Sequence, residues 1–371
     1  MGIEKIKLNN FRNFNKETLS FNENTTVIIG PNASGKTNIL EAIFVLATGK
    51  SFKARVDEEM VKHGSEISRI EGRIGTLRQT FNYEENNEVL EEKLEVILTR
   101  GEINIGTTQV EKVARKKLLI NGVPRRLIDF AGNLKVVLFG PWDLDLVTES
   151  PSLRRRFLDT VLSQVDRDYR RSIISYEKGL RQRNRLLLRI RDEGISRSQL
   201  LFWNQLLIKN GDLITQKRRE FFDFVNATAS LNDQIFILDY DNSIISEGRL
   251  EQYAVEEVAA ATTLVGPHRD DFVFKLKNEK TEKQKNERDL SRFGSRGEQR
   301  MGILWLKLAE LKYIEEKVDG KPTLLLDDIF SELDHEHREI VFGIAKDKQT
   351  IITTADPHYI EGIKKVEKIL L

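Results

Sequence analysis

The sequence predicts an α/β fold, in which a mixed sheet with a phosphate-loop core and an antiparallel β region receives an inserted, mostly helical second lobe. Three patterns support this prediction. A short apolar strand at residues 27–29 runs into a glycine-bearing loop and then into helical spacing at 38–47. Residues 152–229 carry apolar side chains at helical spacing, and an apolar strand at 323–326 ends in two carboxylates.

The composition excludes several classes of protein. The chain has 371 residues, of which 39% are hydrophobic, and its 59 basic and 58 acidic residues nearly cancel. This excludes a disordered chain and a histone-like polycation, although a local basic stripe could still bind nucleic acid. The absence of cysteine excludes disulfides and thiolate zinc sites. Without a long apolar run or a secretory signal, we expect no membrane association and a cytoplasmic location.

The middle of the chain predicts a β-rich region followed by a helical hairpin. Residues 66–135 contain strand patterns and the dipeptide Asn121-Gly122, which is the strongest cue for a two-residue hairpin turn. The helical pattern that follows breaks at 192–196, and this break predicts two antiparallel helices.

Strand patterns return from residue 235, and the elements after them complete the first lobe. We expect a charged excursion at 277–292, a helix at 298–316, a strand at 323–326, a helix at 335–345 and a strand at 350–354. The predicted division is a first lobe made of residues 1–148 and 262–371, with a helical lobe inserted at 149–261.

The segment from Gly30 to Thr37 matches the phosphate-loop pattern G-x-x-x-x-G-K-[ST] in its required place between strand and helix. Glycines let backbone N–H groups close around phosphates, and the helix N-terminus adds a positive dipole. Lys36 is expected to reach the β and γ phosphates of ATP, and Thr37 to offer its hydroxyl to Mg²⁺. The predicted nucleotide-binding residues of the loop are Gly30, Pro31, Asn32, Ala33, Ser34, Gly35, Lys36 and Thr37.

The strand at 323–326 is followed directly by Asp327 and Asp328. Ligands of parallel α/β sheets bind at the carboxyl ends of strands, so these residues suit nucleotide chemistry. We expect Asp327 to bind Mg²⁺ and Asp328 to act as the general base for the attacking water, which makes Lys36, Asp327 and Asp328 the candidate catalytic residues. The alternative is a pair of turn-forming aspartates.

A serine-glycine segment at 295–299 opens a helix about 30 residues before the acidic pair. A hydroxyl, a glycine N–H and a helix N-terminus together form an anion site. Each chain already has one phosphate loop, so a second anion site would be redundant within it. We therefore expect this segment to cover the γ-phosphate of the ATP that a second copy of the protein holds. The alternative is a capping box made by Ser295 and Glu298. The segment's candidate residues are Ser295, Gly297, Glu298 and Gln299.

These motifs, in this order, resemble the ABC-type ATPase heads of the SMC-like chromosome and repair proteins, and most closely the RecF family of recombination mediators. Segments 8–14, 46–52, 138–159 and 266–271 also match the family's pattern. The resemblance makes residues 331–334 the D-loop, whose members are Ser331, Glu332, Leu333 and Asp334. It also gives Arg12 a nucleotide contact, against the alternative of a surface arginine. Within 266–271, we expect Asp270 to be structural and leave His268 and Arg269 open.

The sequence departs from the family's pattern at a few positions. Trp142 stands where an acid is usual, Glu149 stands where glycine is usual, and the 277–292 excursion is longer and more charged. The switch histidine of ABC ATPases is not evident, since Thr353 and Thr354 occupy its strand end.

An arginine-rich run at 154–191 holds eleven Arg and one Lys against four acidic residues. Such a stripe suits contacts with the phosphate backbone, which give affinity without sequence readout. The alternative is a helix face whose charges pair with acids elsewhere. The candidate DNA contacts are Arg154, Arg155, Arg170, Arg171, Arg181 and Arg185.

The resemblance implies a weak, DNA-stimulated ATPase that forms an ATP-dependent homodimer on DNA, at junctions of double-stranded and single-stranded segments. It implies DNA gap repair, replication restart and the SOS damage response, with RecO and RecR as partners that help place RecA on single-stranded DNA. The alternatives are a non-catalytic DNA scaffold stabilised by nucleotide, an SMC-like head with another chromosome task, and a transporter-type ATPase.

Overall fold

The computed structural model describes residues 2–77, 89–105, 109–277, 287–318, 320–331, 333–360 and 366–371. The chain separates into two compact units, one made of Met1–Pro141 with Ile314–Leu371 and the other of Trp142–Tyr313. Both chain ends therefore contribute to the first unit. This division places residues 142–148 and 262–313 in the second unit, whereas the sequence analysis assigned them to the first lobe.

A parallel five-stranded sheet forms the phosphate-loop core of the first unit. Its strands, in spatial order, are β10 (Val136–Phe139), β14 (Thr323–Asp327), β15 (Thr350–Thr354), β3 (Thr25–Ile29) and β16 (Val366–Leu370). The continuous burial of β10, β14 and β15 is typical of strands covered on both faces. Because the strands are parallel, the carboxyl ends of β3, β14 and β15 meet at one edge of the sheet.

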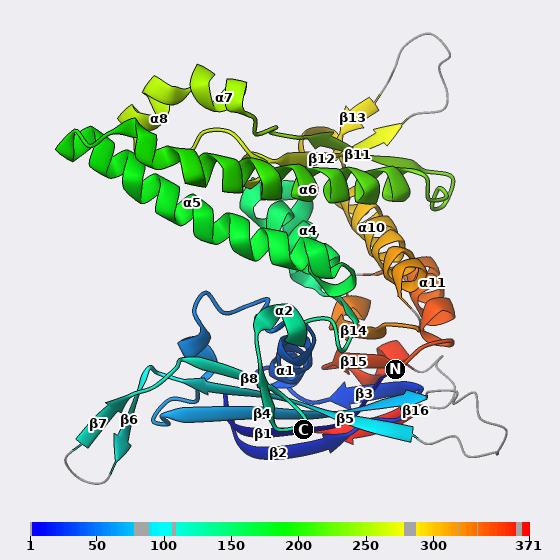
Figure 1. Cartoon of the computed structure of the whole chain (residues 1–371). Coiled ribbons are helices and arrows are strands. Elements are labelled where there is room, and N and C mark those ends of the chain that lie inside the picture. Colours follow the sequence, from blue (N-terminus) through cyan, green and yellow to red (C-terminus); the bar gives the residue numbers. More distant parts are fainter. Residues whose placement is uncertain are drawn as a thin grey trace, which may run out of the picture. The chain divides into compact units, whose positions relative to one another are not determined.

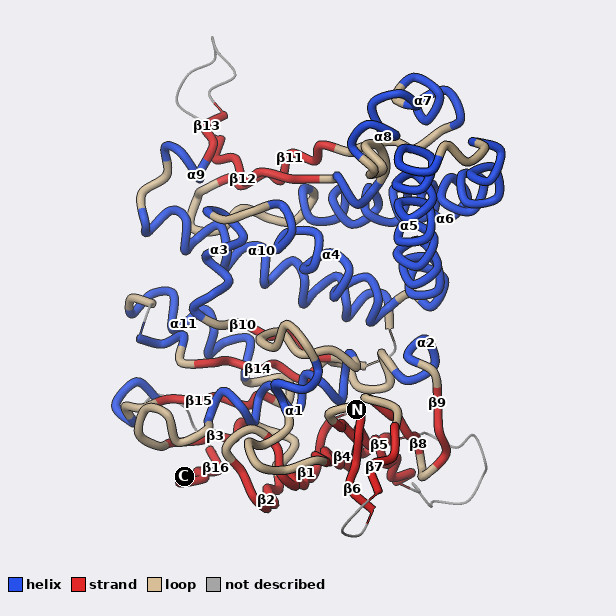
Figure 2. Tube along the Cα trace, turned by 90° about the vertical axis from the view of Figure 1, so that its left-hand side faces the viewer, coloured by secondary structure: helices blue, strands red, loops and turns tan. Residues whose placement is uncertain are grey.

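An antiparallel six-stranded sheet makes the β region of the same unit. Its strands, in spatial order, are β2 (Phe14–Ser20), β1 (Gly2–Phe11), β4 (Ile67–Leu77), β5 (Val89–Thr99), β8 (Lys116–Ile120) and β9 (Val123–Arg125). The predicted hairpin turn joins β8 to β9, and Asn121 and Gly122 both have the positive φ that a type I′ turn needs. A separate pair, β6 (Glu102–Ile105) and β7 (Gln109–Lys112), extends from this region (Figure 2).

Helix α1 (Lys36–Thr48) contacts strands of both sheets and is buried on nearly all sides. A helix with apolar residues all around its circumference is stable only inside a core, which explains its place between the sheets. The remaining helices of the unit are α2 (Leu127–Phe130) and α11 (His335–Ala345), with short 3-10 turns at Asp57–Met60, Ile329–Ser331 and Pro357–Ile360.

The second unit is mostly helical, and Figure 1 shows its two longest helices, α5 and α6, side by side in green. The predicted helical hairpin is confirmed, because α5 ends at Gly194 in the left-handed conformation and α6 runs back along it. Its helices are α3 (Asp145–Thr148), α4 (Pro151–Val165), α5 (Arg167–Glu193), α6 (Leu201–Asn226), α7 (Glu247–Gln252), α8 (Ala254–Ala260) and α9 (Leu290–Phe293). Helix α10 (Arg296–Lys317) starts in this unit and continues across the division at Tyr313.

A small antiparallel sheet completes the second unit with strands β11 (Ile235–Asp241), β12 (Asp271–Lys277) and β13 (Glu287–Asp289). The predicted excursion at 277–292 falls partly outside the described residues, and its described part holds β13 and most of α9. Among the described residues, no helix combines the length and the apolarity needed to cross a bilayer.

Candidate nucleotide-binding site

The phosphate loop lies between β3 and α1, as predicted, and its glycines are sterically required. Gly35 has a φ of +112°, and a Cβ placed there would lie 2.6 Å from the Phe14 ring. A Cβ on Gly30 would lie 2.8 Å from the Ser34 hydroxyl oxygen. The Lys36 ammonium donates to the backbone oxygens of Gly30, at 2.7 Å, and Pro31, at 2.9 Å. The loop therefore curls around its own lysine.

One polar atom in this loop is buried without a partner. The hydroxyl oxygen of Ser34 forms no hydrogen bond in the part of the chain that the structure describes. The loop backbone beside it is fixed, because the Asn13 amide donates to the Ser34 carbonyl at 3.0 Å and accepts from Asn38 at 2.9 Å. Buried polar groups usually have a partner, so an unsatisfied hydroxyl in a phosphate loop fits a phosphate oxygen.

The acidic strand end meets the phosphate loop. The Thr37 hydroxyl donates to Oδ2 of Asp327 at 2.7 Å, and Thr353 donates to the other carboxylate oxygen. Asp327 is buried, with 4% of its surface exposed. A hydroxyl and a carboxylate are ligands that suit Mg²⁺ in nucleotide sites, so the predicted ligand pair fits this ion. Thr353 was not predicted to contribute, and it stands at the strand end where the sequence analysis looked for a histidine.

Asp328 follows β14 in the left-handed backbone region, with a φ of +49°. Its N–H donates to the Thr353 carbonyl at 3.1 Å, and its own carbonyl accepts from Ser331 at 2.8 Å. These bonds fix the turn on both sides. Asp328 is thus held directly after Asp327 at the end of β14, and its role as the general base stays a prediction.

The predicted D-loop begins in this turn and ends at α11. Leu333 is buried, and the Asp334 carboxylate caps α11 by accepting from the His337 N–H at 3.0 Å. This bond lowers the pKa of Asp334. Glu332 lies outside the described residues.

Arg12, the predicted nucleotide contact, is bonded within its own unit. Its guanidinium makes two bonds to the Glu41 carboxylate, at 2.8 and 2.6 Å, and a third to the Glu59 carbonyl at 2.7 Å. Glu41 is fully buried on α1 and also accepts from Ser51. The geometry explains how Arg12 is held, and its contact with nucleotide stays a prediction.

The segment at the start of α10 forms the capping box that the sequence analysis gave as its alternative. The Ser295 N–H donates to Glu298 at 2.8 Å, and the Glu298 N–H donates to the Ser295 hydroxyl at 3.3 Å. The Gln299 amide is buried and donates to the Leu290 carbonyl at 2.8 Å. A Cβ on Gly297 would meet only the Ser295 hydroxyl, at 4.0 Å, so the glycine borders open space.

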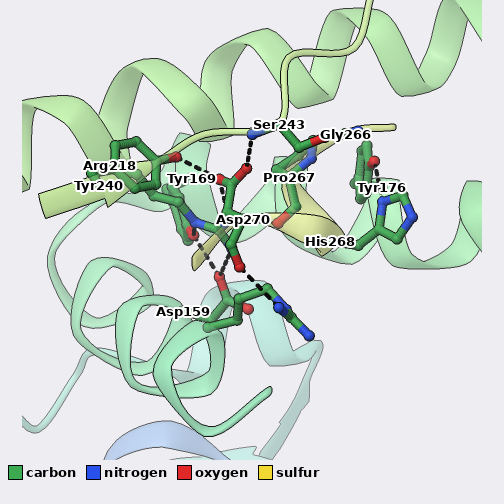
Figure 3. Close-up of polar contacts among 11 residues, drawn as sticks. Asp159, Tyr169, Tyr176, Arg218, Tyr240, Ser243, Gly266, Pro267, His268 and Asp270 are labelled. Atoms are coloured by element: carbon green, nitrogen blue, oxygen red, sulfur yellow. Dashed lines mark hydrogen bonds and ion pairs between the residues drawn. The ribbon is translucent and has the colours of Figure 1, made fainter. Parts of the chain in front are cut away.

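A buried polar network in the second unit was largely missed from the sequence. Arg218, 1% exposed, donates to the carboxylates of Asp159 at 2.8 Å and Asp270 at 2.7 Å, as Figure 3 shows. The hydroxyls of Tyr169 and Tyr240 donate to the same two carboxylates. The structural role expected for Asp270 is confirmed. No sequence motif marks Arg218, since its partners are distant along the chain.

The whole chain resembles known proteins. A family model described as the RecF/RecN/SMC N-terminal domain matches residues 2–371. A protein of Halalkalibacterium halodurans named "DNA replication and repair protein RecF" is 36% identical over 98% of this chain and 94% of its own. The chain belongs to the RecF family. A RecF protein of Agathobacter rectalis is 34% identical over 100% of this chain and 96% of its own.

Solved structures agree with this RecF assignment. The recombination mediator RecF with ATPrS, of the RecFOR pathway, superposes with a TM-score of 0.82 at 29% identity, covering 99% of this chain and 95% of that one. An Smc head bound to the C-terminal winged-helix domain of ScpA has a TM-score of 0.51 at 15% identity, over 99% of this chain and 94% of that one, and shows the shared fold. The predicted ABC-type ATPase head is confirmed. Membership of the RecF family supports ATP binding and a role in DNA repair.

The six arginines predicted to contact DNA fall into three groups, which are buried, half-buried and exposed. Arg154 is 7% exposed and makes a two-bond pair with Asp271, at 2.6 and 2.9 Å, so it is structural and leaves the set of candidate DNA contacts. Arg170 is half-buried. Arg171, Arg181 and Arg185 are exposed on α5. Arg155 is half-buried and donates to the Asp270 carbonyl at 2.8 Å.

Proposed function

We propose that this protein is an ATP-dependent DNA clamp of the RecF type. ATP binds the loop of one protomer, the Ser295 segment of a partner covers its γ-phosphate, and the closed homodimer holds DNA until slow hydrolysis reopens it. The observation that carries this proposal is the bond between Thr37 and Asp327, because it joins the phosphate loop to the acidic strand end in one site.

Binding of ATP uses groups that are already in place. The loop N–H groups and the N-terminus of α1 favour phosphate, and the Ser34 hydroxyl supplies an unused donor. Lys36 exchanges its two carbonyl partners for phosphate oxygens. Mg²⁺, held by Thr37 and Asp327, would neutralise charge on the phosphates.

Hydrolysis requires a base beside the attacking water. Asp328 suits this role, because its turn is fixed by Thr353 and Ser331 and its carboxylate follows directly after the metal-binding Asp327. It accepts a proton from the water as the water oxygen attacks the γ-phosphorus. ATP then works as a switch, since the free energy of its binding acts through the affinity of the dimer.

The partner's contribution is argued from the start of α10. Ser295, the N–H of Gly297 and the N-terminus of a 22-residue helix together offer hydrogen bonds and a positive dipole to an anion. The capping box fixes Ser295 and Glu298 without closing the space at Gly297. This arrangement supports a signature motif that acts in trans, because each protomer already holds phosphates with its own loop.

Exposed cations on α5 support contact with DNA. Arg171, Lys178, Arg181 and Arg185 recur every three, four or seven residues, which places them on one solvent-exposed face of the helix. From Arg171 to Arg185 this face extends about 21 Å, which suits several consecutive phosphates of a DNA backbone.

The biological part of the proposal comes from the family. The solved RecF structures are described as those of a mediator in the RecFOR pathway. We infer that this chain acts with RecO and RecR to place RecA on single-stranded DNA at gaps, during replication restart and the SOS damage response in the cytoplasm. A weak, DNA-stimulated ATPase activity would time its release.

Sedimentation velocity with ATP, ADP or no nucleotide, with and without gapped duplex, tests the proposal. We expect a dimer only with ATP, stabilised further by DNA. A dimer that forms equally in all three conditions, without ATP turnover, would instead support a nucleotide-stabilised scaffold. Co-purification with membranes and an ATPase rate indifferent to DNA would support a transporter-type ATPase.

A further inference from the structure

The turn at residues 266–271 is held rigidly by a neutral histidine. Nε2 of His268 lies 3.0 Å from the Thr263 carbonyl, which can only accept, so Nε2 carries the proton. Nδ1 therefore accepts from the Tyr176 hydroxyl at 2.8 Å. Burial lowers the pKa of His268 to about 4, in agreement with a neutral ring. Gly266 has a φ of +123°, and a Cβ there would clash with the same hydroxyl.

Both acids of the turn are engaged by other arginines, and Figure 3 shows the pair of Asp270 with Arg218. Asp270 is fully buried and accepts from Arg218 and from the Ser243 N–H, each at 2.7 Å. Asp271 accepts both of its bonds from Arg154. The carboxylates next to the two remaining cations are therefore already in use.

Those remaining cations are Arg155 and Arg269, and each is anchored by a neutral group. Arg155 donates to the Asp270 carbonyl at 2.8 Å, and Arg269 donates to the Thr263 carbonyl at 3.0 Å. Within the described part of the chain, neither forms an ion pair with a carboxylate. Arg155 bonds to the backbone of Asp270, and Arg269 is the residue directly before Asp270, so both cations are attached to the same turn.

We propose that Arg155 and Arg269 form a binding site for a phosphodiester group of the DNA backbone. A carbonyl anchor orients a guanidinium without neutralising it and leaves its other N–H donors for a ligand. Planar guanidinium groups match phosphate with paired hydrogen bonds, which is why arginine serves at such sites. The turn at 266–271 fixes where the two guanidinium groups lie, because the ring of His268 and the backbone of Asp270 are bonded to the buried network.

This inference rests on the proposed binding of DNA and adds a second contact surface to it. Tyr176, which bonds to His268, lies on the buried face of α5, whereas Arg171, Arg181 and Arg185 lie on its exposed face. The turn and the exposed stripe of α5 are therefore separate surfaces, and their contributions to binding can be removed independently.

The test is the salt dependence of binding to a fluorescent duplex, measured by anisotropy for the full chain with ATP. Each phosphate contact contributes about 0.9 to the slope of log K against log salt concentration. For Arg269→Gln we expect the slope to fall by about one, and for Arg155→Gln with Arg269→Gln by about two, with affinity roughly tenfold weaker at 0.1 M salt. The weakening should be equal for duplexes of unrelated sequence.

Arg191→Gln is the matched control, since it removes one exposed arginine that is paired with Asp192 in the same unit and lies off the exposed face of Arg171, Arg181 and Arg185. We expect a smaller change of slope for it than for Arg269→Gln. The double variant Arg155→Lys with Arg269→Lys should keep most of the slope because it keeps the charge. Arg269 is exposed, so its substitution decides the matter even where the Arg155 variant is unstable.

Two results would count against the inference in different ways. If the wild-type protein binds duplex and Arg269→Gln binds it with an unchanged slope, the phosphate site is refuted while the proposed function stands. If the wild-type protein does not bind DNA under any nucleotide condition, the proposed function fails and this inference fails with it.

Discussion

Thr37 and Asp327 are separated by 290 positions in the sequence, and their side chains are joined by a hydrogen bond of 2.7 Å. The parallel sheet explains this meeting. Strands β3 and β14 flank β15, so the loop after β3 and the carboxylate after β14 emerge at one edge, with Thr353 of β15 between them. The two ends of the chain therefore build one nucleotide site.

Removing the Thr37 hydroxyl should weaken Mg²⁺-dependent ATP binding. Thr37→Val keeps the shape of the side chain but deletes one ligand and one bond to Asp327. We expect affinity for ATP in the presence of Mg²⁺ to fall about tenfold, a change of about 1.4 kcal/mol, with little effect when Mg²⁺ is absent. Titration calorimetry with and without Mg²⁺ measures both values.

Thr48→Val is the control for that experiment. Thr48 lies in the last turn of the same helix, and its hydroxyl bonds to the backbone oxygens of Phe44 and Lys50. It should leave ATP affinity unchanged. Equal losses for the two variants would mean that Thr37 acts only through the stability of α1.

Asp328→Asn should abolish turnover and preserve ATP-dependent dimerisation. Asparagine adopts the left-handed backbone conformation as readily as aspartate, so the turn with a φ of +49° is kept. Loss of a general base lowers the rate about 10²- to 10⁴-fold. Phosphate-release assays together with sedimentation test both halves, and hydrolysis at the parental rate would show that Asp328 is not the base.

The buried His268 should make the protein less stable in acid. Burial, assisted by the charge of Arg269, lowers its folded-state pKa to about 4, so the unfolded chain binds more protons between pH 6.5 and 4. Stability from this group is present above pH 6.5 and is lost as the pH falls toward 4. The loss between pH 7 and pH 5 is about 2 kcal/mol.

His268→Gln lacks this titration. Denaturant unfolding at pH 7 and pH 5 should therefore show a smaller decrease in the free energy of unfolding for His268→Gln than for the wild type. All other residues are the same in the two proteins, so their contributions cancel in the comparison. An identical decrease in both proteins would show that His268 does not carry the effect.

The sequence predicts the nucleotide site better than it predicts the helical unit. Lys36 lies in a loop pattern between a strand and a helix, and Asp327 lies at the acidic end of an apolar strand. Both patterns consist of neighbouring residues in the sequence, so the sequence alone predicts where these two side chains lie. Thr353 has no such pattern, because its role depends on β15 lying between β14 and β3.

Arg154 and Arg218 show why the charges of the second unit were harder to assign. Composition counts both only as cations, Arg154 within the run at 154–191 and Arg218 beyond it, yet Arg154 is paired with Asp271 and Arg218 with Asp159 and Asp270. These partners come from 52 to 117 residues away. Tertiary packing decides which arginines are buried, and the helical periodicity of the sequence does not reveal the distant partners that this packing brings together.

Mixing two inactive variants tests the central claim, that neither protomer alone completes a catalytic pocket. Lys36→Met disables the phosphate loop, and Ser295→Asp keeps a good helix cap while it places a carboxylate against the partner's triphosphate. Each variant alone should be inactive. In an equimolar mixture, heterodimers hold one intact site, so the ATPase rate should return to at most roughly a quarter of the wild-type rate. A Ser295→Asp protein that hydrolyses ATP at the wild-type rate by itself, or a mixture that stays inactive, would contradict the account.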